Sequence, residues 1–228
     1  MEPSQTTLPG AEHINWNFIK DRLDHCRNNH GSCTPPQREH WTDFRLIDVD
    51  RMCLVLPHDN PRFVALSYVW GVGLEANTIQ CTKSNLPILE QEGSLQSLSL
   101  PATIQDALEA CAKLDERYLW VDRLCIVQDD AETKQHQIEH MESIFGCADF
   151  VLISTHGKDM HAGIAGISAK RKDQLVSRLF RTYVVGQQMH LNMAIAKSTW
   201  TTRGWTYQEA VLPTRRVWLT ESWVYFEC

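Results

Sequence analysis

Apolar residues recur along the chain with two periods, and their order predicts an α/β fold. Continuous apolar runs at residues 63–70, 118–121 and 150–153 have the pattern of β-strands that are covered on both faces. Residues 101–114 place apolar side chains at helical spacing after a proline, which is favoured in a first helical turn. Residues 132–148 repeat the helical period. The alternation of strands and helices predicts a parallel sheet flanked by helices.

Additional elements are predicted before this unit. Residues 13–26 have the spacing of an amphipathic helix, which we expect to cover the domain at its N-terminal side. Residues 44–49 and 52–56 are two short β-like runs around an Asp-Arg turn, which predicts a hairpin. We therefore divide the chain into a helical lead-in, residues 1–40, and one domain, residues 41–228.

The last third of the chain has less regular patterning. Residues 155–200 have no clean period, and we expect a variable insertion or a lid there. A short helix follows at 205–212, and two β runs at 216–219 and 223–227 predict a C-terminal β extension. The chain stops just after the last run, which fits a piece of a longer protein.

Composition and charge narrow the class of protein. The 228 residues are 43% hydrophobic, which is enough for a sizeable core. The formal charge is -6 and no run of basic residues is present, so we expect no nucleic-acid partner. Residues 1–12 lack a signal-peptide pattern, and no apolar stretch approaches the about 18 residues of a spanning helix. We expect no membrane span and a soluble, cytoplasmic protein.

One group of cysteine and histidine residues has a spacing that zinc sites use. It consists of Cys26, His30 and Cys33, with His25 beside them. A structural zinc site needs four ligands, and no second close-spaced pair supplies the remainder. We therefore assign no metal and interpret the segment as a helix end held by small side chains. The eight cysteines are expected to be reduced in a reducing compartment.

The segment 203–209 combines a carboxylate with an aromatic side chain. Glu209 follows Trp205 by four residues, so the two residues share a helix face. If that face borders a pocket, the indole forms an apolar wall and Glu209 acts as a tunable acid or base.

Three long blocks of sequence occur in a fixed order. They are FVALSYVWG (63–71), LPATIQDA (100–107) running into YLWVDRLCIVQDD (118–130), and RGWTYQE (203–209). Together these blocks resemble the fungal heterokaryon incompatibility (HET) domain. The resemblance covers about residues 40–228, and Arg123 departs from it because the family more often has a small residue there. It implies an effector of programmed cell death after fusion of genetically unlike fungal cells, usually joined to other domains or regulated by a partner.

The same blocks are distantly similar to TIR domains, which have a flavodoxin-like sheet and in some branches hydrolyse NAD. Residues 63–68, 118–122 and 150–154 are similar to the first, second and fourth TIR strands. Trp205 and Glu209 match the tryptophan and the catalytic glutamate of a TIR helix. This similarity implies NAD as a substrate, no bound cofactor, and self-association, because a TIR-like NADase completes its pocket across a protomer contact.

Candidate binding residues lie where the predicted strands end, because ligands of open parallel sheets bind beyond the carboxyl ends of the strands. They are Ser67, Tyr68, Trp70, Gly71, Asp122, Arg123 and Ser154, joined by Arg203 and Trp205 from the last block. The aromatic rings would stack a base, an arginine would contact pyrophosphate, and Asp122 would hold a ribose hydroxyl. Glu209 is the catalytic candidate, because a carboxylate stabilises the oxocarbenium-like ribose that forms when nicotinamide leaves.

Most of these candidates also have a structural interpretation. Tryptophans such as Trp70, Trp120 and Trp205 commonly fill cores. Gly71 suits a turn with positive φ. Aspartate is a favoured helix N-cap, which applies to Asp122, Asp129 and Asp130.

Glu209 has a structural alternative of its own, as a buried carboxylate paired with Arg203 or Arg215. A cysteine nucleophile is a weaker possibility, with Cys125 near Asp122 and a distant histidine, because ten histidines make such a pairing almost unavoidable.

Two functional hypotheses follow from different classes. The first is a TIR-like NAD glycohydrolase that causes cell death through Glu209. The second is a non-catalytic signalling module with the same fold that triggers death by homotypic or partner assembly.

Overall fold

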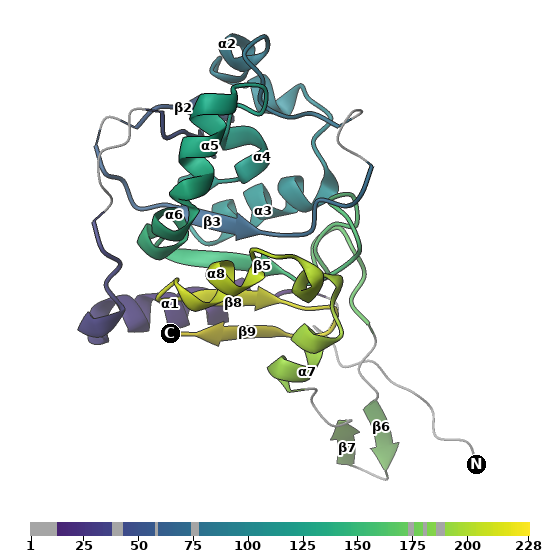
Figure 1. The fold of residues 1–228 in the computed structure, drawn as a ribbon. Coiled ribbons are helices and arrows are strands. Elements are labelled where there is room, and N and C mark those ends of the chain that lie inside the picture. Colours follow the sequence, from purple (N-terminus) through teal and green to yellow (C-terminus); the bar gives the residue numbers. More distant parts are fainter. Residues whose placement is uncertain are drawn as a thin grey trace.

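The computed structural model describes residues 13–37, 43–57, 59–73, 78–172 and 190–228, together with the backbone of strands at 176–179 and 182–185. The described residues form a seven-stranded sheet with the order β2-β1-β4-β3-β5-β8-β9 (Figure 1). In that spatial order the strands are β2 (Cys53–Val55), β1 (Leu46–Asp48), β4 (Tyr118–Trp120), β3 (Val64–Ser67), β5 (Phe150–Ser154), β8 (Arg216–Leu219) and β9 (Val224–Glu227).

The centre of the sheet is the parallel unit β4-β3-β5-β8. Counted by position along the chain, these strands have the spatial order 2-1-3-4, which is that of the first four strands of a flavodoxin-like sheet. The hairpin β1-β2 joins β4 in antiparallel orientation, and β9 joins β8 in the same way. The predicted parallel sheet and hairpin are confirmed. The two last β runs are more than an extension, because β8 pairs in parallel with β5 inside the sheet.

Helices cover both faces of the sheet. In Figure 1, α6 and α8 lie on the nearer face, and α1 and α3 lie on the farther face. The helices are α1 (Trp16–Asn29), α2 (Leu86–Leu89), α3 (Ala102–Lys113), α4 (Asp122–Cys125), α5 (Ala131–Glu139), α6 (Met141–Cys147), α7 (Leu191–Ala196) and α8 (Thr206–Val211), with 3₁₀ turns η1 (Gly31–Cys33), η3 (Ser94–Gln96) and η4 (Thr199–Thr202). None of the helices in the described ranges has both the length and the apolar character that crossing a membrane requires.

The predicted N-terminal cover is helix α1. It begins after Asn15, whose side-chain oxygen accepts a hydrogen bond from the Phe18 amide (3.1 Å). Its apolar stripe of Ile19, Leu23 and Cys26 is buried. The helix therefore packs as the amphipathic pattern predicted.

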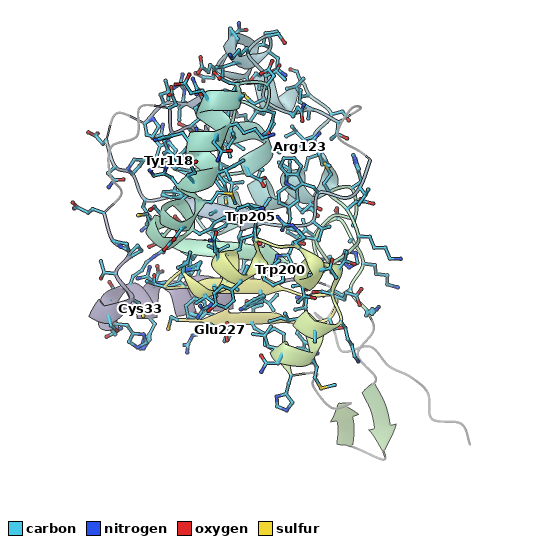
Figure 2. The ribbon with its side chains drawn as sticks, viewed as in Figure 1. Cys33, Tyr118, Arg123, Trp200, Trp205 and Glu227 are labelled. Carbon is cyan, nitrogen blue, oxygen red and sulfur yellow. The ribbon has the colours of Figure 1, made fainter. Side chains whose placement is uncertain are left out.

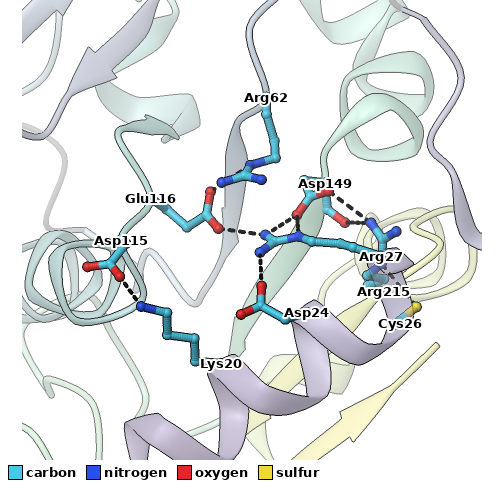
Figure 3. A network of polar contacts seen from close by, with 9 residues as sticks. All are labelled: Lys20, Asp24, Cys26, Arg27, Arg62, Asp115, Glu116, Asp149 and Arg215. Carbon is cyan, nitrogen blue, oxygen red and sulfur yellow. Dashed lines mark hydrogen bonds and ion pairs between the residues drawn. The ribbon is translucent and has the colours of Figure 1, made fainter. Parts of the chain in front are cut away.

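A network of charged side chains fixes α1 to the amino ends of the parallel strands (Figure 3). Glu116, Arg62, Asp149 and Arg215 come one or two residues before β4, β3, β5 and β8. Arg27 from α1 forms ion pairs with both Glu116 and Asp149. Arg62 Nε lies 3.1 Å from the second Glu116 oxygen, and Arg215 Nη1 lies 2.9 Å from Asp149 Oδ1. In sheet order the four strand-edge charges alternate in sign.

The helix predicted over residues 132–148 is interrupted, which corrects that prediction. Helix α5 ends at His140, whose φ and ψ of -97° and 6° are not helical, and α6 begins directly after it. The buried Gln137 side chain donates from Nε2 to the carbonyl oxygen of Asp43 (2.8 Å) and so ties the end of α5 to the segment before β1. The apolar pattern of residues 132–148 could not indicate the break, because it depends on this contact with a distant segment.

The segment predicted as an insertion or lid, residues 155–200, is described in part. Its beginning packs against α3, because Asp106 Oδ2 accepts hydrogen bonds from the Ile164 amide (2.5 Å) and the Ser168 hydroxyl (2.6 Å). Met160 and Ile164 are buried. Strands β6 (Val176–Leu179) and β7 (Thr182–Val185) pair as a separate antiparallel hairpin. Residues 173–175, 180–181 and 186–189 lie outside the described residues, and the lid remains a prediction.

Candidate functional site

A cavity of about 310 Å³ opens beyond the carboxyl ends of β3 and β4. Its wall brings together segments that are far apart in the sequence, and Trp205, at the start of α8, is labelled in Figure 2. The lining residues are Trp70, Asp122, Ile126, Gln128, Lys134, Ile138, Met141, Arg203 and Trp205. Four of the predicted binding residues, Trp70, Asp122, Arg203 and Trp205, therefore share one cavity.

Asp122 is the titratable carboxyl group of this wall. The Trp70 indole Nε1 donates to both of its oxygens (2.9 and 3.1 Å), and the Arg123 amide donates to Oδ1 (2.7 Å). Burial raises the pKa of Asp122 from 3.8 to about 6, with Glu209 adding to the rise and Arg203 opposing it. A carboxyl group with that pKa exchanges protons near neutral pH, which is the property of a general acid or base.

Glu209 lies behind the cavity and is not among its lining residues. Its side chain is 2% exposed and accepts hydrogen bonds from the Ser67 hydroxyl (2.5 Å) and from both terminal nitrogens of Arg203 (3.1 and 3.2 Å). The Trp200 indole donates to the same Ser67 hydroxyl (2.7 Å). The prediction of an ion pair with Arg203 is confirmed.

The alternative partner of Glu209 was wrong. Arg215 lies at the opposite end of the strands, where it pairs with Asp149. Because Arg203 both lines the cavity and holds Glu209, it connects the carboxylate to the cavity wall.

Arg123 supports the wall from inside. Arg123 is fully buried, and its guanidinium donates to the carbonyl oxygens of Ile79 and Thr78 (both 2.8 Å). The same guanidinium lies 5.1 Å from the Trp70 ring centroid, a cation–π distance. Arg123 therefore anchors the segment before α2 and supports Trp70, and it is not one of the residues that line the cavity.

Tyr68, Gly71 and Ser154 complete the predicted set. Tyr68 is buried, which raises the pKa of its hydroxyl well above the usual value. Ser154 is also buried, at the end of β5. Gly71 has a φ of +89°, so the structural interpretation of this glycine as a positive-φ turn is confirmed.

The three tryptophans divide between core and cavity. Trp120 is fully buried, as the core interpretation predicted. Trp70 is half-buried and Trp205 is 46% exposed, and both line the cavity. Two indoles are therefore available to a ligand.

Two polar residues of the wall were not predicted from the sequence. Gln128 donates from Nε2 to the Asp122 carbonyl oxygen (3.0 Å), and Lys134 brings a positive charge from α5. Gln128 belongs to the block 118–130, so its position after a strand end was the available signal. Lys134 had none, because a lysine on an amphipathic helix is ordinarily solvated.

Cys125 lacks the properties of a nucleophile. It is fully buried in α4, and burial raises the pKa of its thiol far above the usual range. A reactive cysteine needs an accessible thiolate.

Comparison with known proteins gives one family and one curated relative. Residues 63–209 match the model of the family described as "Heterokaryon incompatibility protein (HET)". The chain is 28% identical over 103 residues to "Heterokaryon incompatibility protein 6, OR allele" of Neurospora crassa. That match covers 41% of the chain and 14% of the relative, so the chain spans a small part of the relative's length. No solved structure matches the chain significantly.

Proposed function

This chain belongs to the heterokaryon incompatibility (HET) family, and from that membership we propose that it is an effector domain of fungal heterokaryon incompatibility that triggers cell death. The name of the Neurospora crassa relative supports this role. Because the match covers 14% of that relative, the domain is proposed to act within a larger protein or with a regulatory partner.

We propose further that the domain is a TIR-like NAD glycohydrolase with Glu209 as its catalytic carboxylate. The observation that carries the proposal is the cavity that joins Trp70, Asp122, Arg203 and Trp205 beyond the strand ends. Its volume of about 310 Å³ is at the lower end of ligand pockets and suits one half of a dinucleotide.

Each group on the wall has a role in this proposal. Trp70 and Trp205 stack the nicotinamide ring or the adenine. Arg203 and Lys134 contact pyrophosphate oxygens, and Asp122 hydrogen-bonds a ribose hydroxyl. The mixture of aromatic, cationic and carboxylate side chains is the support for a nucleotide as ligand.

The chemistry requires Glu209 to reach the ribose. Pyrophosphate competes with Glu209 for Arg203, and binding of the substrate therefore opens the carboxylate toward the cavity. The bond between the nicotinamide nitrogen and ribose C1′ breaks, and its electron pair neutralises the charged ring. Glu209 stabilises the resulting ribose cation and accepts a proton from the water that adds to it.

One observation favours the second candidate, a non-catalytic assembly module. Glu209 is buried and held by Ser67 and Arg203, which is also the geometry of a structural ion pair. In that case the same surface would serve homotypic or partner contacts, and the Glu209 charge would matter only for stability.

Nicotinamide release from NAD by the clustered domain separates the two candidates. The chain, fused to an oligomerising tag, is incubated with NAD, and nicotinamide is quantified by chromatography. We expect turnover by the wild type and at least a 100-fold loss in Glu209→Gln, the range of a lost electrostatic stabiliser. Glu116→Gln is the matched control, because it also disrupts a buried glutamate–arginine pair, at the other end of the strands.

Two outcomes would contradict catalysis. One is no nicotinamide release by the clustered wild type. The other is full fungal toxicity of Glu209→Gln, which would select the assembly module.

A further inference from the structure

Four metal-ligating side chains from the two ends of the described chain meet beside α1. Cys26 and His30 come from the last turn and the C-cap of α1, Cys33 ends η1, and Cys228 follows β9. One ligand atom from each residue lies within 4.8 Å of the other three. His30 and Cys228 are 198 residues apart in the sequence, so the sheet brings them together.

Local structure explains how one short segment offers three ligands. Cys26 and His30 are four residues apart, and the His30 amide donates to the Cys26 carbonyl oxygen (2.9 Å), so the two side chains lie one above the other. The Cys33 amide then donates to the His30 carbonyl oxygen (2.9 Å), which folds the chain back. The three side chains therefore converge on one point.

The distances suit a tetrahedral metal site. With Zn–S of about 2.3 Å and Zn–N of about 2.1 Å, ligand atoms in a tetrahedron are about 3.6–3.8 Å apart. Cys228 Sγ lies 3.4 Å from His30 Nδ1, and every other separation is within 4.8 Å. A contraction of about 1 Å or less completes the tetrahedron.

A buried cation stands beside the cluster on the inner side. Arg215 is 2% exposed, and its Nε donates to Cys26 Sγ at 3.1 Å, while its Nη1 pairs with Asp149 (Figure 3). Three thiolates and one neutral imidazole around a dication carry a net charge of about -1. The guanidinium of Arg215 balances that charge and hydrogen-bonds a ligand sulfur, as outer-shell partners of metal sites do.

The donor set also identifies the metal. Three thiolates and one imidazole favour Zn²⁺ among the divalent ions, and four protein ligands leave no position for a substrate. The site is reachable, because Cys33 and His30 are half-buried and Cys228 is exposed.

We propose that Cys26, His30, Cys33 and Cys228 bind one structural Zn²⁺, which staples the N-terminal helix to the edge strand β9. Binding displaces up to three thiol protons, which go to solvent, and no electron is transferred. The metal closes a loop of almost the whole domain, so it restricts the unfolded chain strongly. This site is independent of the cavity at the carboxyl ends of the strands.

The first test counts metal in the purified chain. The protein is prepared under reducing conditions with zinc in the growth medium, and its metal content is measured by mass spectrometry of the elements. We expect one equivalent of zinc in the wild type and less than about a tenth of that in Cys33→Ser and Cys228→Ser, since three ligands hold Zn²⁺ far more weakly than four. Cys147→Ser, which changes a half-buried cysteine outside the cluster, should keep one equivalent.

A second test does not depend on the folding of variants. The wild type is stripped with a chelator and then titrated with Zn²⁺ or Co²⁺. We expect Tm to fall by about 5 °C or more on stripping and to recover with one equivalent of zinc. Bound Co²⁺ should show the thiolate charge-transfer and tetrahedral d–d absorption bands. His30→Cys should retain metal, because zinc also accepts four cysteines.

Three results would overturn the proposal. They are a wild type without zinc that also takes up none after stripping, a Cys147→Ser variant that loses zinc as Cys228→Ser does, and a disulfide among Cys26, Cys33 and Cys228 in protein purified without oxygen.

Discussion

The two ends of the parallel strands contain buried charges in opposite arrangements. At the amino ends, Glu116 and Asp149 each pair with two arginines, and the network is completed by α1. At the carboxyl ends, Asp122 accepts hydrogen bonds from neutral donors only and faces a cavity of about 310 Å³. The amino ends are closed by this network, whereas the carboxyl ends keep an open cavity beside Asp122 in addition to the buried Arg203–Glu209 pair.

Shifted pKa values alone would not distinguish these ends. Burial raises the pKa of Glu116 at the amino ends, where two arginines oppose the rise, and it raises the pKa of Asp122 at the carboxyl ends to about 6. The difference is that Asp122 borders open volume while Glu116 faces its own counter-ions. A perturbed carboxyl group therefore indicates a site only together with a cavity.

The largest expected change in the free energy of unfolding comes from a substitution at the amino ends of the strands. Asp149→Asn leaves Arg27 and Arg215 without their shared carboxylate, and Arg215 is almost fully buried. We expect the free energy of unfolding to fall by about 3–5 kcal/mol, as for other broken buried pairs. Denaturant unfolding at pH 7 measures it.

The matched control is Asp115→Asn, which breaks the exposed pair with Lys20. Asp115→Asn should lower the free energy of unfolding far less than Asp149→Asn does, because solvent screens an exposed ion pair. If Asp149→Asn lowers the free energy of unfolding no more than Asp115→Asn does, the contrast between the two ends is wrong.

At the carboxyl ends, we expect substitution of Asp122 to raise the free energy of unfolding at pH 7, by a smaller amount than Asp149→Asn lowers it. The pKa of Asp122 is about 6 in the folded chain against 3.8 in the reference state, so the folded state holds its proton more tightly. The contribution of protonated Asp122 to the free energy of unfolding is therefore complete below about pH 4. It is lost as the pH rises through about 6, by up to about 3 kcal/mol. Asp122→Asn keeps the acceptor oxygen for Trp70 and removes the charge. We expect it to be more stable than the wild type at pH 7 and equally stable at pH 4.

Unfolding curves at a series of pH values check this prediction. A variant that is less stable than the wild type at pH 7 would show that Asp122 is a structural charge like those at the amino ends.

The smallest effect on stability is expected for the exposed indole. Trp205 is 46% exposed, so Trp205→Ala should change the free energy of unfolding by less than about 1 kcal/mol. Loss of a stacked ring should weaken NAD binding about 5- to 10-fold, because aromatic stacking contributes about 1–1.5 kcal/mol. Calorimetric titration measures the affinity. Tyr207→Ala, on the same helix and 74% exposed, is the control that should bind normally.

Sequence periodicity predicted the parts of the fold that depend on local pattern. The runs that became β3, β4 and β5 are buried strands, and helix α3 begins and ends within a residue of its prediction. The parallel pairing of β8 with β5 could not be predicted, because residues 155–200, which have no clean period, and a short helix separate the two strands.

Contacts between residues far apart in the sequence could not be predicted from local pattern. Ser67 and Glu209 are 142 residues apart, and no local pattern indicates their hydrogen bond. The place of Cys228 beside Cys26, His30 and Cys33 was also not predicted, because only the fold of β9 brings it to α1. The available signal was a cysteine directly after the last predicted β run.

The alternating charges at the amino ends also specify the alignment of the strands. Each charge precedes its strand by one or two residues, so a slip of one residue moves it by about 3.3 Å along the strand. Such a slip takes an ion pair out of hydrogen-bond distance and exchanges the two faces of the strand. The network thus favours the native register of the strands, because only that register forms all of its ion pairs at once.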